Sequence, residues 1–321
     1  NTAPALTLAA FQARDGGEDP ILVITPADQT VQNQAAFVKA LQDCVALVHA
    51  DQSKQTIAIL GITPTAPETG YGYIKRIGGA NGAGAAGTYC EYTVEKFVEK
   101  PDAQTAQSYL ADGNYLWNSG MFVLKASTWL SSLKEFRADI EEAAQKAWQA
   151  KSEDTSGGVS FIRPGKAEFE AIPSDSIDYA VIEKCPQSRF PIKMVELNAG
   201  WNDLGAWDAV WQVGTQDESG NVTSGDTLLA NVKNSLVHAN SRLVCAVGVE
   251  SLVIVETADA VLIANRGNSQ DVKNIVTQLE AQGREEKNLH RKVSRPWGWY
   301  DSVDEGERFK VKRIQVKPGA S

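Results

Sequence analysis

The 321-residue chain has 31 lysines and arginines against 40 aspartates and glutamates, a formal net charge of −9, and 43% of its residues are hydrophobic. This composition is typical of a globular protein, and no stretch approaches the roughly 20 uninterrupted apolar residues of a membrane-spanning helix. The acidic total, with no run of lysine and arginine, also argues against a non-specific nucleic-acid binder, which presents clustered cations to phosphates.

The cysteines give no sign of a metal cluster or of a disulfide framework. They lie far apart, at positions 44, 90, 185 and 245, and a chain of this length does not depend on covalent cross-links. No secretory signal or transit sequence is recognisable. We therefore expect a cytoplasmic protein that binds neither membranes nor nucleic acid.

Up to about residue 213, apolar runs alternate with segments of helical periodicity. The run Ile21–Ile24 between two prolines predicts a buried strand, and apolar residues at helical spacing predict a helix over 33–49. With a second buried run over 56–62, they form a strand–helix–strand unit typical of a parallel sheet. We therefore expect a mixed, mainly parallel α/β domain. The other predicted segments are strands over 93–98, 115–124 and 191–196, helices over 103–112, 127–150 and 205–213, and a polar linker over 151–166.

After residue 221 the pattern changes to short strands, each followed by Asn, Gly, Glu or Asp. A spacing of about 8–10 residues between them is typical of a small all-β unit, either a sandwich or a β-solenoid. A helix near 272–279, a polar linker over 280–291 and the first strands of a further domain over 295–321 follow. The predicted short strands cover 227–230, 235–238, 243–247, 252–257 and 261–264.

Two aspartates occupy places where α/β sheets position ligands, just beyond the strands. Asp28 follows the strand 21–24, and Asp203 precedes a helix that begins near Gly205. Two such carboxylates can hold a hard divalent cation whose other ligands are water and phosphate oxygens. Taken alone, each also has a plainer interpretation, Asp28 as a turn residue and Asp203 as a helix cap.

Other segments combine polar groups with glycine. Glu99-Lys100-Pro101 pairs an acceptor for sugar hydroxyls with a cation for a phosphate, although a solvated strand end can have the same sequence. Glycines flank an aromatic residue in Gly70-Tyr71-Gly72, and Gly120 interrupts an apolar strand, which predicts a bulge or a close approach of the backbone to a ligand. The three histidines are scattered, so neither a histidine triad nor a zinc site is expected.

Seven motifs occur in order along the chain: Asn1-Thr2-Ala3-Pro4-Ala5, Pro26-Ala27-Asp28, Glu68-Thr69-Gly70-Tyr71-Gly72-Tyr73-Ile74, Phe97-Val98-Glu99-Lys100-Pro101, Trp117-Asn118-Ser119-Gly120-Met121-Phe122, Ser176-Ile177-Asp178-Tyr179-Ala180 and Trp201-Asn202-Asp203-Leu204-Gly205-Ala206-Trp207. Together they resemble the bacterial mannose-1-phosphate guanylyltransferases of the long type that is fused to a mannose-6-phosphate isomerase domain. Arg295-Pro296-Trp297-Gly298 and Phe309-Lys310-Val311-Lys312-Arg313-Ile314 resemble the beginning of that family's C-terminal cupin.

The resemblance implies a fold and a domain order. A Rossmann-like nucleotidyltransferase domain is expected over 1–221, a short β-helix over 222–268, a helix and linker over 269–294, and the start of a cupin-type isomerase domain over 295–321. In the family, a Gly-rich loop that cradles the GTP phosphates would precede residue 1, and the metal-binding histidines of the cupin would follow residue 321. The chain is therefore expected to be a fragment, inactive on its own.

The resemblance also implies an activity: transfer of GMP from GTP to mannose 1-phosphate, giving GDP-mannose for polysaccharide biosynthesis, and pyrophosphate. Asp28, Lys100 and Asp203 are the expected catalytic residues, with the two aspartates holding Mg²⁺ and the lysine meeting the sugar phosphate. Gln29 stands where the family usually has His. The full-length protein is expected to add isomerase activity, and a homo-oligomer is compatible with the family. The expected substrate-binding residues are Asn1, Thr2, Gly72, Tyr73, Glu99, Asn118, Gly120 and Asp178.

Two alternatives remain at this point. One is a non-catalytic subunit that binds a nucleotide sugar, although the presence of Asp28, Lys100 and Asp203 argues against it, because a binding protein needs no metal pair. The other is a related nucleotidyltransferase that uses another nucleotide, such as a thymidylyl- or uridylyltransferase. Only the family motifs select GTP.

Overall fold

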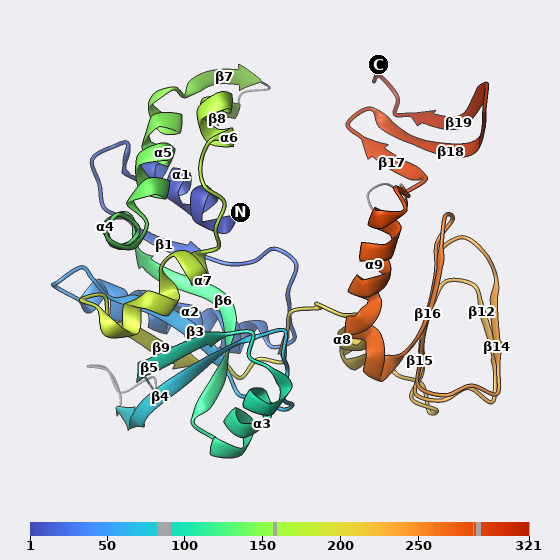
Figure 1. Cartoon of the computed structure of the whole chain (residues 1–321), viewed down its shortest axis with the longest axis horizontal. Coiled ribbons are helices and arrows are strands. Elements are labelled where there is room, and N and C mark those ends of the chain that lie inside the picture. The colour runs from blue at the N-terminus through green and yellow to red at the C-terminus, as the bar shows by residue number, and fades with distance from the viewer. Residues whose placement is uncertain (82–90, 157–158, 285, 287–289, 321) are drawn as a thin grey trace. The chain divides into compact units, whose positions relative to one another are not determined.

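The computed structural model describes residues 1–81, 91–156, 159–284, 286 and 290–320. The chain forms two compact units, 1–203 and 204–321 (Figure 1). The first contains the α/β fold and every predicted site residue, and the second contains the short strands.

The first unit is built on a six-stranded sheet in the order β1-β6-β3-β9-β5-β4. The strand β6 lies between β1 and β3 and is antiparallel to both. Of the neighbouring strands described in this sheet, β3 and β9 alone are parallel. The strands are β1 (Ile21–Ile24), β3 (Ile57–Ile62), β4 (Gly72–Asn81), β5 (Glu91–Glu99), β6 (Tyr115–Lys125) and β9 (Ile192–Glu196).

The α/β class and the mixed sheet are confirmed, but the prediction of a mainly parallel sheet is wrong. β1 and β3 do point the same way, as the strand–helix–strand pattern requires, yet β6 is inserted between them in the opposite direction. An apolar run identifies a strand buried on both faces, but it carries no information about the direction of that strand. The direction of β6 therefore follows from its pairing with β1 and β3, and the apolar pattern of the sequence could not predict it.

Helices cover both faces of the sheet (Figure 1). Successive residues of β3 point to opposite sides: Ile57 and Ile59 join the core formed with α1, α4 and α5, while Ala58 and Leu60 join the core formed with α2 and α3. All six positions of β3 are therefore buried. The helices are α1 (Thr2–Arg14), α2 (Gln34–Ala50), α3 (Ala103–Asp112), α4 (Ala126–Phe136) and α5 (Ala138–Gln149).

The segment 151–166, predicted as a polar linker, contains an antiparallel hairpin of β7 (Ser152–Ser156) and β8 (Val159–Arg163). The hairpin has little buried apolar surface, so hydrophobic patterning did not reveal it. Shorter elements complete the unit: α6 (Lys166–Glu170), α7 (Ile177–Ala180), the 3-10 helix η1 (Ile182–Gln187), and β2 (Thr30–Val31) paired with β10 (Trp201–Asn202).

The second unit stacks short strands in parallel. Its first sheet has the order β11-β13-β15-β16, in which β11, β13 and β15 are parallel, and β12 pairs in parallel with β14. This arrangement is a β-helix, the solenoid alternative of the prediction. The strands are β11 (Val222–Ser224), β12 (Thr227–Ala230), β13 (Leu236–Ala239), β14 (Val244–Val247), β15 (Leu252–Glu256) and β16 (Val261–Asn265).

The β-helix is preceded by α8 (Trp207–Val213) and followed by the 3-10 helix η2 (Arg266–Asp271) and α9 (Val272–Ala281). A three-stranded antiparallel sheet of β17 (Lys292–Arg295), β18 (Gly298–Gly306) and β19 (Phe309–Val316) ends the chain. None of the helices described in this structure combines the length and the apolar run that a membrane crossing requires.

Candidate active site

Three of the predicted site residues meet where β4, β5 and β6 lie next to one another. Gly72 is the register partner of Glu99. A Cβ atom placed on Gly72 would lie 2.5 Å from Glu99 Oε2 and 3.2 Å from Asn118 Cβ. A side chain at position 72 would crowd both neighbours, so glycine favours the close approach of the strands here.

Lys100 lies next to this cluster, directly after the last residue of β5. Its ammonium lies 3.0 Å from Glu99 Oε1, and its side chain is 57% exposed. Its backbone has a left-handed φ of 48°, and its N–H donates to the carbonyl of Tyr71 at 3.2 Å. The hydrogen bond to Glu99 raises the pKa of Lys100. The result is a charged, accessible ammonium that the backbone holds beside an acceptor, which suits binding of a phosphate.

Asn118 is fixed by hydrogen bonds on both sides of its amide. Its Nδ2 donates to Asp178 Oδ1 at 2.9 Å, and its Oδ1 accepts from the N–H of Gly120 at 3.0 Å. The strand register shifts here, and Gly120 has a left-handed φ of 71°, so the predicted bulge is confirmed. Burial, and then the negative charge of Glu99, raises the pKa of Asp178 to about 6.

The N-terminal residues contact the beginning of α7, next to this region. Thr2 Oγ1 accepts from the N–H of Ile177 at 3.0 Å, next to Asp178. Asn1 Oδ1 accepts from the N–H of Thr2 at 2.8 Å and so caps α1. Both residues therefore have structural roles at the edge of the site, and contact of either with a substrate stays a prediction.

The two predicted metal-binding carboxylates lie beyond the same end of the β2–β10 pair. Asn202 lies opposite Thr30 in this antiparallel register. Continuing this antiparallel register by one residue places Asp203, which follows β10, opposite Gln29, which precedes β2. Asp28 is the next residue before Gln29. Asp28 is exposed and Asp203 is partly exposed, so neither is used as core, and both suit a cation that keeps water and phosphate oxygens as its other ligands. Among the described residues no group of three or more His, Cys, Asp or Glu side chains could hold a metal.

Gln29 and Tyr71 hold the strand that carries Asp203, and the sequence did not reveal either role. Gln29 Oε1 accepts from Trp201 Nε1 at 2.8 Å, and its Nε2 donates to the carbonyl of Ser119 at 2.9 Å. The hydroxyl of Tyr71 donates to Asp203 Oδ1 at 2.8 Å. Burial and the hydrogen bond to Asp203 raise the pKa of Tyr71, so its hydroxyl stays protonated.

Two further side chains change the predicted picture. Tyr73 is fully buried and its hydroxyl donates to the carbonyl of Glu68 at 2.9 Å, so its side chain has a structural role, and contact of Tyr73 with a substrate stays a prediction. Glu183, which no motif argument singled out, accepts from the N–H of Glu99 at 3.2 Å. Burial raises the pKa of Glu183. The sequence alone could not single out Glu183, because a lone glutamate in such a short polar segment is usually a solvated surface residue.

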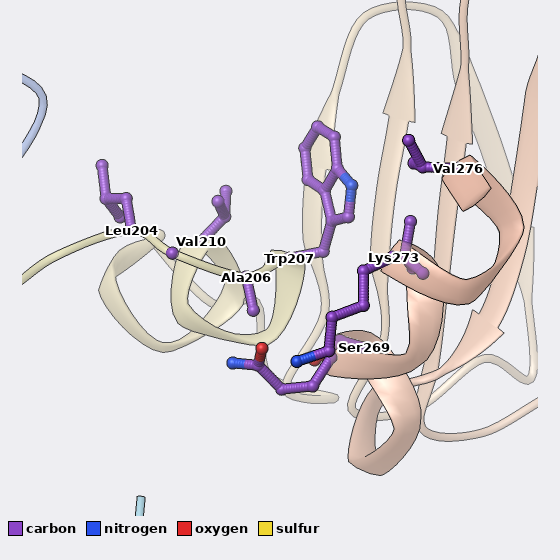
Figure 2. A pocket seen from close by; sticks show the side chains of 10 residues that line it. Leu204, Ala206, Trp207, Val210, Ser269, Lys273 and Val276 are labelled. Carbon is purple, nitrogen blue, oxygen red and sulfur yellow. The ribbon is translucent and has the colours of Figure 1, made fainter. Parts of the chain in front are cut away.

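A separate hollow of about 420 Å³ lies within the second unit (Figure 2). Trp207 and Val210 of α8 and Val276 of α9 form much of its apolar wall, and Lys273 and Gln270 supply polar groups. None of the residues predicted for catalysis or substrate binding lines it, so the candidate active site is the cluster in the first unit.

Three family models match consecutive parts of the chain. The family model described as nucleotidyl transferase matches residues 1–220. The chain belongs to the nucleotidyl transferase family. Two further models match the remainder: a β-helix domain described as mannose-phosphate isomerase/GMP-like over 225–279, and the mannose-6-phosphate isomerase C-terminal family over 282–321.

Several named proteins are similar to this nucleotidyl transferase along its whole length. The xanthan biosynthesis protein XanB of Xanthomonas campestris is 48% identical over 321 residues, all of this chain and 64% of that protein. The mannose-1-phosphate guanylyltransferase of Escherichia coli is 44% identical over 99% of this chain and 64% of its own length. The chain thus spans a little under two thirds of the length of these curated relatives.

Two crystal structures also resemble the chain. One is mannose-1-phosphate geranyltransferase from Thermus thermophilus, with a TM-score of 0.72 and 28% identity over 87% of this chain and 75% of that chain. The other is mannose-6-phosphate isomerase from Helicobacter pylori, with a TM-score of 0.53 and 28% identity over 63% of this chain and 70% of that chain.

Proposed function

We propose that this protein is a mannose-1-phosphate guanylyltransferase that transfers GMP from GTP to mannose 1-phosphate. The choice of nucleotide and sugar rests on relatives of that name that are 44% and 46% identical to this chain. We place the reaction in the cytoplasm, where GTP is available, and its product GDP-mannose suits the polysaccharide pathways for which other relatives are named, xanthan and alginate biosynthesis.

One observation carries the proposal: a cation suited to a phosphate and a carboxylate suited to a metal are joined through a single residue. Tyr71 accepts from the N–H of Lys100 through its carbonyl and donates to Asp203 through its hydroxyl. Nucleotidyl transfer brings a sugar phosphate and a nucleotide α-phosphate together, so it requires both kinds of group within one site.

In the reaction that we propose, a phosphate oxygen of mannose 1-phosphate attacks the α-phosphorus of GTP. The bond from that phosphorus to the oxygen bridging to the β-phosphate breaks, and pyrophosphate leaves. Lys100 neutralises the charge of the incoming sugar phosphate and orients it. Glu99 accepts hydrogen bonds from the sugar hydroxyls, and the amide of Asn118 can both accept from them and donate to them. Gly72 leaves room for the sugar ring beside these two side chains.

Asp28 and Asp203 would hold Mg²⁺. A bound divalent cation neutralises the charge on the transferring phosphate. The donor set fits this ion, because Mg²⁺ commonly takes one or two carboxylates and fills its remaining positions with water and substrate phosphates.

The direct test is release of pyrophosphate by the purified full-length protein. We expect release with GTP and mannose 1-phosphate together, loss of release when EDTA removes divalent cations, and weak release with UTP or dTTP. Equal rates with UTP would favour the related nucleotidyltransferases. Tight binding of GDP-mannose without any release of pyrophosphate would support a non-catalytic binding subunit and contradict the proposal.

A further inference from the structure

Tyr71 is attached to both charged ends of the candidate site through two separate groups. Its phenol oxygen donates to Asp203 Oδ1 at 2.8 Å, and its carbonyl oxygen accepts from the N–H of Lys100 at 3.2 Å. The first contact belongs to the side chain and the second to the backbone. A change of side chain can therefore remove one contact and leave the other.

The ring of Tyr71 is held by two tryptophans. Its centroid lies 4.9 Å from that of Trp117 and 5.5 Å from that of Trp201, at interplanar angles of 77° and 67°. Edge-to-face contacts of this kind fix the orientation of an aromatic ring. The hydroxyl therefore points at Asp203 from a rigid position.

The carbonyl of Tyr71 acts where the backbone is strained. Lys100 has a φ of 48°, a left-handed conformation that costs free energy for any residue except glycine. Such a conformation persists only where neighbouring contacts maintain it. The hydrogen bond from the Lys100 N–H to the Tyr71 carbonyl is one of these contacts, and the ion pair of Lys100 with Glu99 at 3.0 Å is another.

We propose that Tyr71 is a positioning residue that sets the Asp203 carboxylate for a divalent cation through its hydroxyl, and sets the Lys100 backbone through its carbonyl. The inference rests on the proposed function, in which Asp203 meets the metal and Lys100 meets the sugar phosphate. Because the two contacts come from different groups, Tyr71→Phe weakens the metal end alone.

The test measures binding rather than turnover. Mn²⁺, an oxygen-preferring stand-in for Mg²⁺ that is visible by EPR, is titrated into the wild-type protein and Tyr71→Phe, and mannose 1-phosphate binding is measured by calorimetry. We expect Tyr71→Phe to weaken Mn²⁺ binding about ten-fold, the scale of a lost hydrogen bond to a charged group, and to leave mannose 1-phosphate binding unchanged. Circular dichroism and thermal melting check that each variant is folded.

Two further variants test the route of the effect. Tyr73→Phe removes a phenol oxygen two residues away that donates to the carbonyl of Glu68 instead, and should leave Mn²⁺ binding as in the wild type. In a double-mutant cycle with Asp203→Asn, Tyr71→Phe should cause no additional loss of Mn²⁺ affinity, because it acts through the carboxylate that is already gone.

The possible results separate the inference from the proposed function. Unchanged Mn²⁺ binding in Tyr71→Phe, equal weakening of Mn²⁺ and mannose 1-phosphate, or additive losses in the cycle would each overturn the role of Tyr71. A wild-type protein that binds neither Mn²⁺ nor mannose 1-phosphate would refute the proposed function, and the inference with it.

Discussion

We expect Asp178→Asn to raise the free energy of unfolding and to weaken the binding of mannose 1-phosphate. Asp178 Oδ1 accepts from Asn118 Nδ2 at 2.9 Å, and the amide oxygen of asparagine can accept the same bond. The substitution therefore removes a partly buried charge that faces Glu99, while it keeps the size and the hydrogen bond of the side chain. Stability and function should consequently move in opposite directions.

The size of the effect follows from the pKa of Asp178, which burial and Glu99 raise from 3.8 to about 6. At about 1.36 kcal/mol for each pKa unit, ionised Asp178 lowers the free energy of unfolding by about 3 kcal/mol at pH 7. Because the folded pKa is the higher one, this penalty is absent below pH 3.8, where the carboxyl is neutral in both states. It grows as the pH rises and is complete above pH 6.

Urea unfolding of the wild type and Asp178→Asn at pH 7.5 and at pH 3.5 measures this difference. We expect a gain of about 1–3 kcal/mol at the higher pH, the lower bound allowing for imperfect packing of the amide, and little difference at the lower pH. Asp102→Asn is the matched control, because Asp102 is an exposed helix cap that accepts from the Thr105 N–H, and it should give no gain. An Asp178→Asn protein no more stable than the wild type at pH 7.5, or equally stabilised at both pH values, would refute this reasoning.

The same variant should bind mannose 1-phosphate more weakly. A carboxylate can only accept, so ionised Asp178 fixes Asn118 with its amide nitrogen toward it and its oxygen toward the N–H of Gly120. An asparagine at position 178 can donate or accept and removes this constraint. Unchanged binding of mannose 1-phosphate by the stabilised variant would show that Asn118 does not hold the sugar.

Four other substitutions test separate parts of the molecule. Asp28→Asn and Asp203→Asn should each lower guanylyltransferase turnover by orders of magnitude with little change in melting temperature, and near-normal turnover of either at saturating Mg²⁺ would contradict the metal assignment. Lys100→Met should raise the KM for mannose 1-phosphate and lower kcat while GTP binding is retained; the reverse pattern in binding assays would assign Lys100 to the nucleotide. Glu256 of the second unit accepts from Ser241 and Arg242, which lowers its pKa to about 2, so its stabilising contribution is present above pH 4.5 and is lost as the pH falls toward 2. Glu256→Gln should therefore lower the melting temperature by several degrees at pH 7 and much less near pH 2, and an equal loss at both pH values would argue against an ionic contribution.

The sequence predicted those parts of the fold that depend on burial. The apolar run 56–62 corresponds to β3, whose six residues are all buried, and the helical periodicity of 33–49 corresponds to α2. The sequence did not predict those features of the fold that the burial of apolar residues does not determine. The hairpin of β7 and β8 buries no apolar face, because Val159 and Phe161 of β8 are exposed. The buried strand β6 has the same apolar pattern in either direction.

The candidate site was predictable as a set of residue types but not as a geometry. Motifs pointed to Glu99, Lys100 and Asn118, whereas the supporting contacts of Tyr71 and Gln29 join residues separated by 132 and 172 positions in the sequence. Such contacts depend on how strands are ordered in the sheet. A glutamine next to an aspartate in a turn gives no indication that it will hold a tryptophan of a distant strand.

The strand β6, whose antiparallel pairing makes the sheet less parallel than predicted, also assembles the site. Because β6 pairs with β4, with Trp117 opposite Tyr73, Asn118 comes to lie beside Gly72. One residue further on, the carbonyl of Ser119 accepts from Gln29, which in turn holds the strand of Asp203. A shift of β6 by one residue would turn Asn118 to the opposite face of the sheet and remove both connections. The antiparallel insertion of β6 and its bulge at Gly120 therefore connect the cluster of Gly72, Glu99 and Asn118 to the strand that precedes Asp203.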